Sequence, residues 1–139
     1  MGRTEGWAEA RPLMGGAARR ARVVTEGHLE ATYSALHVTE TFEWETGAAD
    51  IWRWVMIRGM DGRYVASEAR AGAGIVGRHE GGDYLLDFRR PLTAKGRLLR
   101  GGYATRFSML SPRTALKRVR LSLLGVPLAV MVGEHHRQD

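Results

Sequence analysis

Hydrophobic and polar residues alternate along several short segments of the chain. In the stretch GYATRFSML, residues 102–110, the odd-numbered positions carry Tyr, Thr, Phe and Met, and Ala, Arg and Ser stand between them. In DYLLDF, residues 83–88, Tyr84, Leu86 and Phe88 share one face. A period of two residues is typical of a β-strand whose faces differ in their exposure to water. Both segments therefore predict strands with one drier face.

The segment TALKRVRLSLL, residues 114–124, is ambiguous by composition, because its residues also tolerate a helix. Its pattern favours a strand: Val119, Leu121 and Leu123 alternate with arginine and serine.

Turn signals separate these segments. Asp61-Gly62 lies between two alternating runs, which is one of the strongest hairpin signals in a sequence. Gly81-Gly82 marks a further turn. Closure of a many-stranded meander removes its exposed edges and encloses one core. The pattern predicts an all-β fold, an antiparallel β-barrel of about eight to nine strands.

The chain has 139 residues, enough for one domain but not for two independent cores. Residues 1–16 mix Gly, Arg, Glu and Pro without a sustained period, so we interpret them as a short N-terminal extension. Residues 17–139 are expected to form the barrel domain.

Composition limits the chemistry. The absence of Cys excludes disulfides, thiolate metal sites and a Cys nucleophile. The net charge of +6 comes from 19 Arg and 2 Lys, but the arginines are dispersed from Arg3 to Arg137. Dispersed arginines are explained as well by solvated strand faces, so we expect no nucleic-acid partner.

Targeting signals are missing from the sequence as read. The N-terminal residues carry charges where a signal peptide needs an apolar run. The longest apolar stretch, LLGVPLAVMVG, is interrupted by Pro127 and is much shorter than the roughly 20 residues of a transmembrane helix. We therefore expect no transmembrane segment and a cytoplasmic location.

Several elements together resemble a known family. They are the stretch ETFEW (residues 40–44), an aromatic-rich segment with Trp54, the hairpin DGRY (residues 61–64), two glycines at 74 and 77, and the stretch from Gly96 to Gly125. In this order the chain, over about residues 16–136, resembles an uncharacterised bacterial lipocalin-like family, a domain of unknown function. The resemblance implies a lipocalin-like (calycin-like) barrel and picks out Glu40 and Arg118. The family has no established activity.

The chain also departs from that family's pattern. The lipoprotein signal and its lipid-attachment Cys are missing, so lipid anchoring is not carried over. Lys117 stands where the family has Asn before the closing Arg, and Ala129-Val130 stands where its last strand has Gly-Glu.

Aromatic residues gather in two bursts, with Phe42 and Trp44 in the first and Trp52 and Trp54 in the second. Each buried ring removes roughly 150–250 Å² from water, so these rings would dominate the core. Two interpretations stay open. The rings either fill the barrel, or line a cavity that holds one small ligand, as barrels of about eight strands can.

Glu40 and Arg118 also allow two interpretations. They form a buried ion pair that fixes strand register, or Arg118 recognises the acid group of a fatty acid, because its planar guanidinium matches a carboxylate. The candidate ligand-binding residues are Glu40, Phe42, Trp44, Trp54, Met56, Tyr64, Tyr103, Phe107, Met109 and Arg118.

The other motifs point to no specific chemistry. Glu43, Glu45 and Asp50 form an acidic cluster near a loop, which is usually a solvated face, with a general acid–base pair as the alternative. No His spacing forms a metal site, and His135-His136 are expected in a solvated tail. No G-x-S-x-G or similar nucleophile pattern occurs. The glycines of AGAGIVG, residues 71–77, lack the long helix of a dinucleotide-binding fingerprint. We expect no catalytic residue, no metal and no cofactor.

The sequence thus predicts a lipocalin-like protein that binds a small apolar or amphiphilic molecule of the lipid or fatty-acid class. Two alternatives stay open: a small β-barrel enzyme, of isomerase or cyclase type, and a purely structural or partner-binding module. A buried, unpaired carboxylate in a cavity would favour the enzyme. A filled barrel would favour the structural module. Oligomeric state, including a homodimer, is left open.

Overall fold

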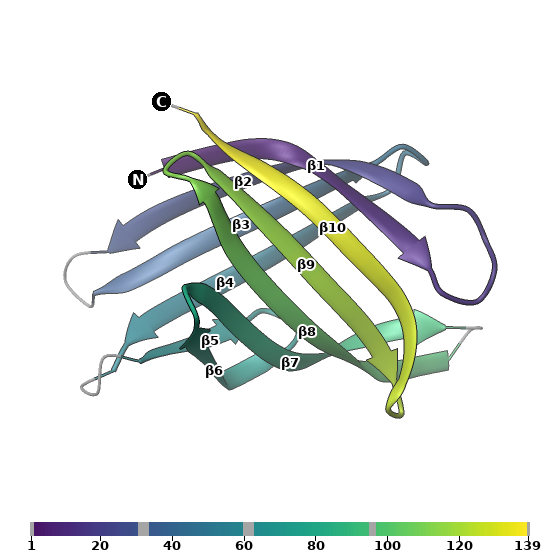
Figure 1. Ribbon diagram of the computed structural model, residues 1–139. Coiled ribbons are helices and arrows are strands. Elements are labelled where there is room, and N and C mark those ends of the chain that lie inside the picture. The colour runs from purple at the N-terminus through teal and green to yellow at the C-terminus, as the bar shows by residue number, and fades with distance from the viewer. Residues whose placement is uncertain (1, 31–33, 60–62, 95–96, 139) are drawn as a thin grey trace.

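The computed structural model describes residues 2–30, 34–59, 63–94 and 97–138, and within them every regular element is a β-strand. The strands form a closed barrel in which sequence neighbours are antiparallel partners and β1 pairs with β10 (Figure 1). Their bounds are β1 Gly2–Pro12, β2 Arg19–Glu30, β3 Ala35–Trp44, β4 Ala49–Arg58, β5 Tyr64–Glu68, β6 Gly72–Glu80, β7 Asp83–Ala94, β8 Arg97–Ser111, β9 Thr114–Leu123 and β10 Val126–Gln138. The predicted antiparallel barrel is confirmed, with ten strands in place of about eight to nine.

The expectation of an N-terminal extension is wrong, because Gly2–Pro12 is a barrel strand. β1 pairs with β2 from Gly2 to Ala10 and with β10 from Arg3 to Pro12, so it closes the sheet (Figure 1). Its inward positions carry small side chains, including Gly6 and Ala8, and therefore show no bulky alternation. A Cβ on Gly6 would overlap the carbonyl oxygen of Glu134, so only glycine allows this approach to β10.

The other sequence signals hold where they can be compared. The segment 114–123 is strand β9, as its alternation predicted. Gly81 and Gly82 form the turn between β6 and β7, with positive φ angles of 58° and 94° that suit glycine. The Asp61-Gly62 turn lies outside the described residues, but the strands on either side of it, β4 and β5, are antiparallel partners from Trp54–Glu68 to Arg58–Tyr64.

Two apolar clusters occupy different parts of the barrel interior. The first joins Ala8, Ala21, Val23 and Phe42. The second joins Trp54, Ala66, Ile75 and Leu86. The inward positions of β1 and β2 carry mostly small side chains, whereas those of β4, β7 and β8 carry aromatic rings. The side of the barrel formed by β1 and β2, called the thin wall below, therefore carries less side-chain volume than the side formed by β4, β7 and β8.

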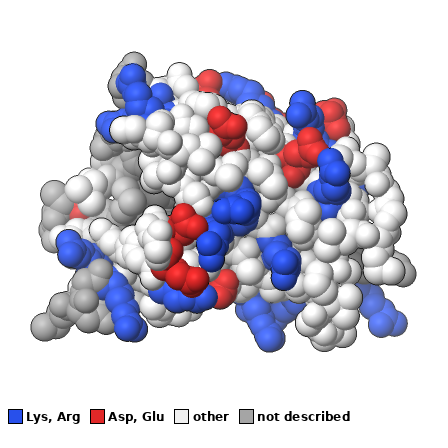
Figure 2. Space-filling model, viewed as in Figure 1, with Lys and Arg blue, Asp and Glu red and all other residues white. Residues whose placement is uncertain are grey.

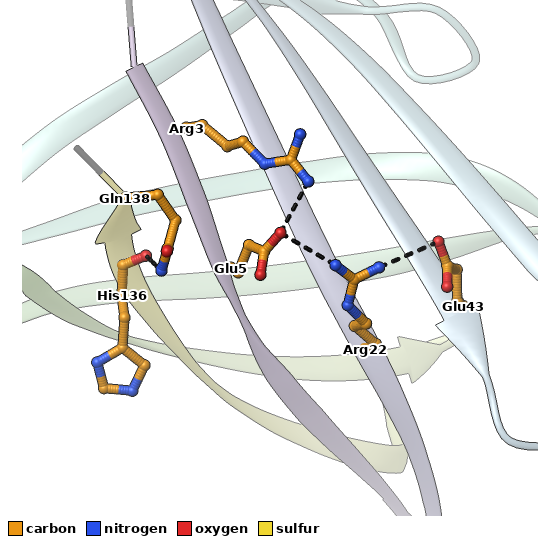
Figure 3. A network of polar contacts seen from close by, with 6 residues as sticks. All are labelled: Arg3, Glu5, Arg22, Glu43, His136 and Gln138. Carbon is orange, nitrogen blue, oxygen red and sulfur yellow. Dashed lines mark hydrogen bonds and ion pairs between the residues drawn. The ribbon is translucent and has the colours of Figure 1, made fainter.

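The outer face of the barrel is charged. Basic and acidic side chains are interspersed over the face seen in Figure 2. On β1–β3, Glu5 Oε1 accepts from Arg3 Nη2 at 2.7 Å and from Arg22 Nη2 at 3.0 Å, and Arg22 Nη1 lies 3.7 Å from Glu43 (Figure 3). Exposed pairs of this kind contribute little to stability but keep the surface hydrated.

No helix that could cross a membrane by length and apolar character occurs in the described parts of the chain.

Candidate functional site

The barrel encloses a cavity of about 520 Å³. Aromatic side chains form much of its wall, namely Phe42, Trp44, Trp52, Trp54, Tyr84, Phe88, Tyr103 and Phe107. Small residues such as Ala10, Ala115 and Ala129 line other parts of it. The volume falls in the range of small-molecule sites, roughly 300–1,000 Å³. The barrel is therefore not filled, and the observation that would favour a purely structural module is not met.

The aromatic wall is held together by ring contacts around Trp52. Its centroid lies 6.2 Å from that of Trp54 in a stacked arrangement. It also lies 5.9 Å from Phe88 and 5.4 Å from Tyr103, both in edge-to-face arrangements. Such contacts fix the rings against one another. The rings thus act both as core and as cavity wall, so the two interpretations of the aromatic bursts are not exclusive.

A carboxylate inside this apolar cavity, that of Glu40, is held by two side-chain donors. Glu40 on β3 and Lys117 on β9 are both buried, and Lys117 Nζ donates to Glu40 Oε2 at 2.8 Å. Trp54 Nε1 donates to Glu40 Oε1 at 3.0 Å. Because β2, β1 and β10 separate β3 from β9, the ion pair crosses the barrel interior instead of joining neighbouring strands. Both oxygens of the carboxylate therefore have a donor.

The surroundings of Glu40 keep it ionised. Burial by itself raises the pKa of its carboxyl, but the charge and hydrogen bond of Lys117, with smaller contributions from His135 and Trp54, outweigh burial and lower the pKa below its usual range.

His135 on β10 completes this polar cluster of Glu40, Lys117 and His135. It is buried and lines the cavity, whereas its neighbour His136 points outward. Burial and the charge of Lys117 lower the pKa of His135 against the opposing effect of Glu40, so the ring is neutral at pH 7. A Cβ on the nearby Gly133 would lie 3.1 Å from the carbonyl oxygen of Trp7 and 3.4 Å from His135 Nε2, so the absence of a side chain there relieves crowding mainly against β1. The expectation that His135 belongs to a solvated tail is wrong.

A second buried ion pair lies toward one end of the barrel. Arg90 Nε on β7 donates to Glu68 Oε1 on β5 at 2.8 Å. The same oxygen accepts from the backbone N–H groups of Arg70 and Ala71, both at 3.0 Å, in the turn after β5. The guanidinium carbon of Arg90 lies 3.6 Å from the centroid of the Trp52 ring. This pair ties a turn to the aromatic wall.

Seven of the ten candidate ligand-binding residues line the cavity. Those that line the cavity are Glu40, Phe42, Trp44, Trp54, Met56, Tyr103 and Phe107. Their contact with a ligand stays a prediction.

Three candidates do not line the cavity. Arg118 points to the outer face, where its Nη2 lies 3.4 Å from Ser108 Oγ, because inward and outward positions alternate and Lys117 takes the inward one. The predicted Glu40–Arg118 pair is thus replaced by Glu40–Lys117. Met109 lies beside a register shift near the end of β8 and is 63% exposed. Tyr64, at the start of β5, is 37% exposed.

Sequence reasoning missed Lys117 and His135. The signal for Lys117 was present, because it shares the inward parity of Val119 and Leu121. A lysine on the apolar face of a strand indicates a buried partner of opposite charge. His135 had no comparable signal, because its inward neighbour Gly133 hides the alternation.

The acidic residues around the turn from β3 to β4, namely Glu43 on β3, Glu45 in the turn and Asp50 on β4, have different surroundings. Glu43 pairs with Arg22 on the outside, and Glu45 Oε1 accepts from the backbone N–H of Arg20. Asp50 lines the cavity and accepts from Trp44 Nε1 at 2.9 Å. Within the described residues, no group of three or more His, Asp or Glu side chains is arranged to hold a metal ion.

Comparison with known proteins identifies the fold and no more. No family model matches the chain, and no curated protein matches it. Among solved structures the chain is similar to the S-type phycobiliprotein lyase CPES from Guillardia theta, with a TM-score of 0.62 over 100% of this chain and 88% of that chain, at 10% identity. The fold is thus an all-β, antiparallel, lipocalin-like barrel. At this identity the likeness carries no residue roles.

Proposed function

We propose that the protein binds one small apolar or amphiphilic molecule of lipid size inside the barrel, without a chemical step of its own. The observation that supports this most directly is the cavity of about 520 Å³, which has an aromatic wall and one compact polar cluster. An apolar enclosure with a few convergent polar groups is the usual form of a small-molecule site.

The ionisation of Glu40 argues against the enzyme alternative. A general base in an apolar cavity works when burial raises its pKa toward neutrality. Here Lys117 and Trp54 occupy both carboxylate oxygens and the pKa is lowered. Glu68, the other buried carboxylate among the described residues, is paired through Oε1 with Arg90, and although its Oε2 has no partner, Glu68 does not line the cavity. A paired carboxylate is a poor proton acceptor, so the polar cluster fits recognition better than proton transfer.

The similar fold of a phycobiliprotein lyase leaves that alternative testable. By its name that protein is an enzyme, so a lipocalin-like barrel does not by itself distinguish a binder from a catalyst. His135 is the group that an isomerase or cyclase would use, because it is neutral and faces the cavity. Binding requires that a ligand be released unchanged, whereas catalysis requires turnover.

Tryptophan fluorescence reports on the cavity directly. Trp44, Trp52 and Trp54 line it, whereas Trp7 points outward and is 39% exposed. In a Trp7→Phe background, titration with apolar probes should change the emission saturably. Ala115→Phe, which fills part of the cavity, should weaken binding about ten-fold or more. Ala104→Phe, on the exposed outer face of β8, is the matched control and should leave it unchanged.

Native mass spectrometry identifies the natural ligand. Protein purified from its own host should carry an adduct of lipid size, and the Ala115→Phe variant should carry less of it. The proposal fails if no adduct appears and none of the apolar probes changes the tryptophan emission. Recovery of a chemically converted probe after incubation would instead support the enzyme.

A further inference from the structure

Two threonine hydroxyls in the cavity have no hydrogen-bond partner in the protein. The Oγ1 atoms of Thr4 on β1 and Thr25 on β2 are buried and unpaired, and both residues line the cavity. They are direct partners across the β1–β2 ladder, and Thr25 is the direct partner of Glu40 across the β2–β3 ladder. The two hydroxyls thus continue the polar cluster along the thin wall of the barrel.

These hydroxyls need an explanation that packing does not give. Valine has the same shape, equal preference for strands and no buried polar atom, so it would suit both positions better. Buried polar groups in folded proteins have partners with few exceptions. When such groups face a cavity, their partner is a bound water or an atom of a ligand that displaces it.

The charges in the cavity indicate which kind of ligand atom this is. Lys117 is balanced by Glu40, and Arg90 nearby is balanced by Glu68. Asp50 also lines the cavity and adds a negative charge there. His135 is neutral at pH 7. Among the described lining residues there is no uncompensated cation, and an ionised carboxylate buried without one carries a large desolvation cost. A neutral oxygen meets no such cost.

We infer that Thr4 and Thr25 bind a neutral oxygen of the ligand, a hydroxyl or a carbonyl, while its apolar body lies against the aromatic wall. A threonine hydroxyl both donates and accepts, so the pair matches an alcohol in either role and a carbonyl by donation. This inference rests on the proposed function. It replaces fatty-acid recognition with recognition of a neutral amphiphile, such as a long-chain alcohol or ketone.

The test uses probes that share one apolar chain and differ in the head group: decanol, decanoate, decylammonium and decane. The protein should bind decanol more tightly than the other probes. Thr4→Val and Thr25→Val should each weaken decanol binding about five-fold, as expected for one lost hydrogen bond, and should not weaken decane binding. Thr41→Val, on the outer face of β3 beside Glu40, is the matched control and should change nothing.

Stability separates a binding role from a structural one. The valine variants break no hydrogen bond within the protein, so their Tm should be no lower than that of the parent. A Tm lower by several degrees would assign the hydroxyls to the fold and overturn the inference.

The outcomes also separate this inference from the proposed function. If decane and decanol bind equally well, or if decanoate or decylammonium binds best, the inference is overturned while the cavity remains a binding site. If no probe of any head group binds, the proposed function itself is overturned.

Discussion

The two buried ion pairs found in the described residues differ in the kind of group that holds each carboxylate. Glu68 Oε1 accepts three hydrogen bonds, two of them from the backbone, while its Oε2 is buried without a partner, and Arg90 also stacks on Trp52. Glu40 is held by side chains alone, one donor to each oxygen. The first pair sits beside β5, the shortest described strand, and the second crosses the cavity.

This difference indicates that the two pairs have different roles. A buried pair is weak evidence for stability, because desolvation offsets much of the attraction. The Glu68–Arg90 pair is tied into a turn and a ring stack, so its loss would disturb the backbone. The Glu40–Lys117 pair contacts only side chains that face the cavity, and its main effect is that the two opposite charges neutralise each other there. We therefore interpret the first as a structural clamp and the second as part of the ligand site.

Breaking the clamp should give the largest effect. Arg90→Met leaves the Glu68 carboxylate buried with only its backbone donors, and should lower the free energy of unfolding by about 3–5 kcal/mol in urea denaturation. Glu68→Gln combined with Arg90→Met should recover much of this loss, because the charge is gone. Arg78→Met, which removes an exposed pair with Asp87, is the control and should cost less than about 1 kcal/mol. Equal costs for Arg90→Met and Arg78→Met would contradict the clamp.

Breaking the cross-cavity pair should give a smaller effect that depends on pH. Without Lys117, burial dominates and raises the pKa of Glu40, so the carboxyl can neutralise itself by binding a proton. Lys117→Met should therefore cost about 2–3 kcal/mol at pH 8 and less at pH 5. Urea denaturation at both pH values checks this. A cost that does not shrink on acidification would show that Glu40 is not the group left unpaired.

The intact protein should lose stability in two steps as the pH falls. Folding lowers the pKa of His135, so below about pH 6.5 the imidazole binds a proton in the unfolded chain more readily than in the folded protein. The free energy of unfolding therefore falls in this range. The pKa values of Glu40 and Glu68 are lowered as well, so a second loss follows below about pH 4.5. His135→Gln should remove the upper step and keep the lower one. A pH profile that is the same for parent and variant would exclude His135 as its source.

Arg118→Met should give the smallest effect. The side chain lies on the outer face beside Ser108 and shares no contact with the polar cluster. The substitution should change the free energy of unfolding by less than about 0.5 kcal/mol and leave decanol binding unchanged. A fall in affinity for decanoate on this substitution would instead support the hypothesis that Arg118 recognises the acid group of a fatty acid.

Much of the fold was predictable, because side-chain alternation is a local signal. It identified β9 despite its helix-tolerant composition, and it grouped Tyr84, Leu86 and Phe88 on one face, which in the structure is the inner one. It failed for β1, whose inward residues are small. Strand β1 is specified by its two partners and not by its own pattern.

The site was predictable in its apolar part and less so in its polar part. The aromatic residues were found because they are bulky and alternate. The partner of Glu40 was misassigned by one position, since the resemblance pointed to Arg118 while strand parity pointed to Lys117. A shift of one residue along a strand places the side chain on the opposite face of the sheet. The roles of Thr4 and Thr25 depend on register between distant strands, which no local pattern contains.

The ladder between β1 and β10 also affects how the molecule forms. It joins Arg3 to Gln138, so this seam cannot close until nearly the whole described chain has left the ribosome. Until then two strand edges stay open to wrong pairing, and such long-range contacts slow folding. A circular permutant that links the two ends and opens the turn at Gly47 would turn the seam into a local hairpin. It should keep the same barrel, while the late-closing seam moves to the ladder between β3 and β4.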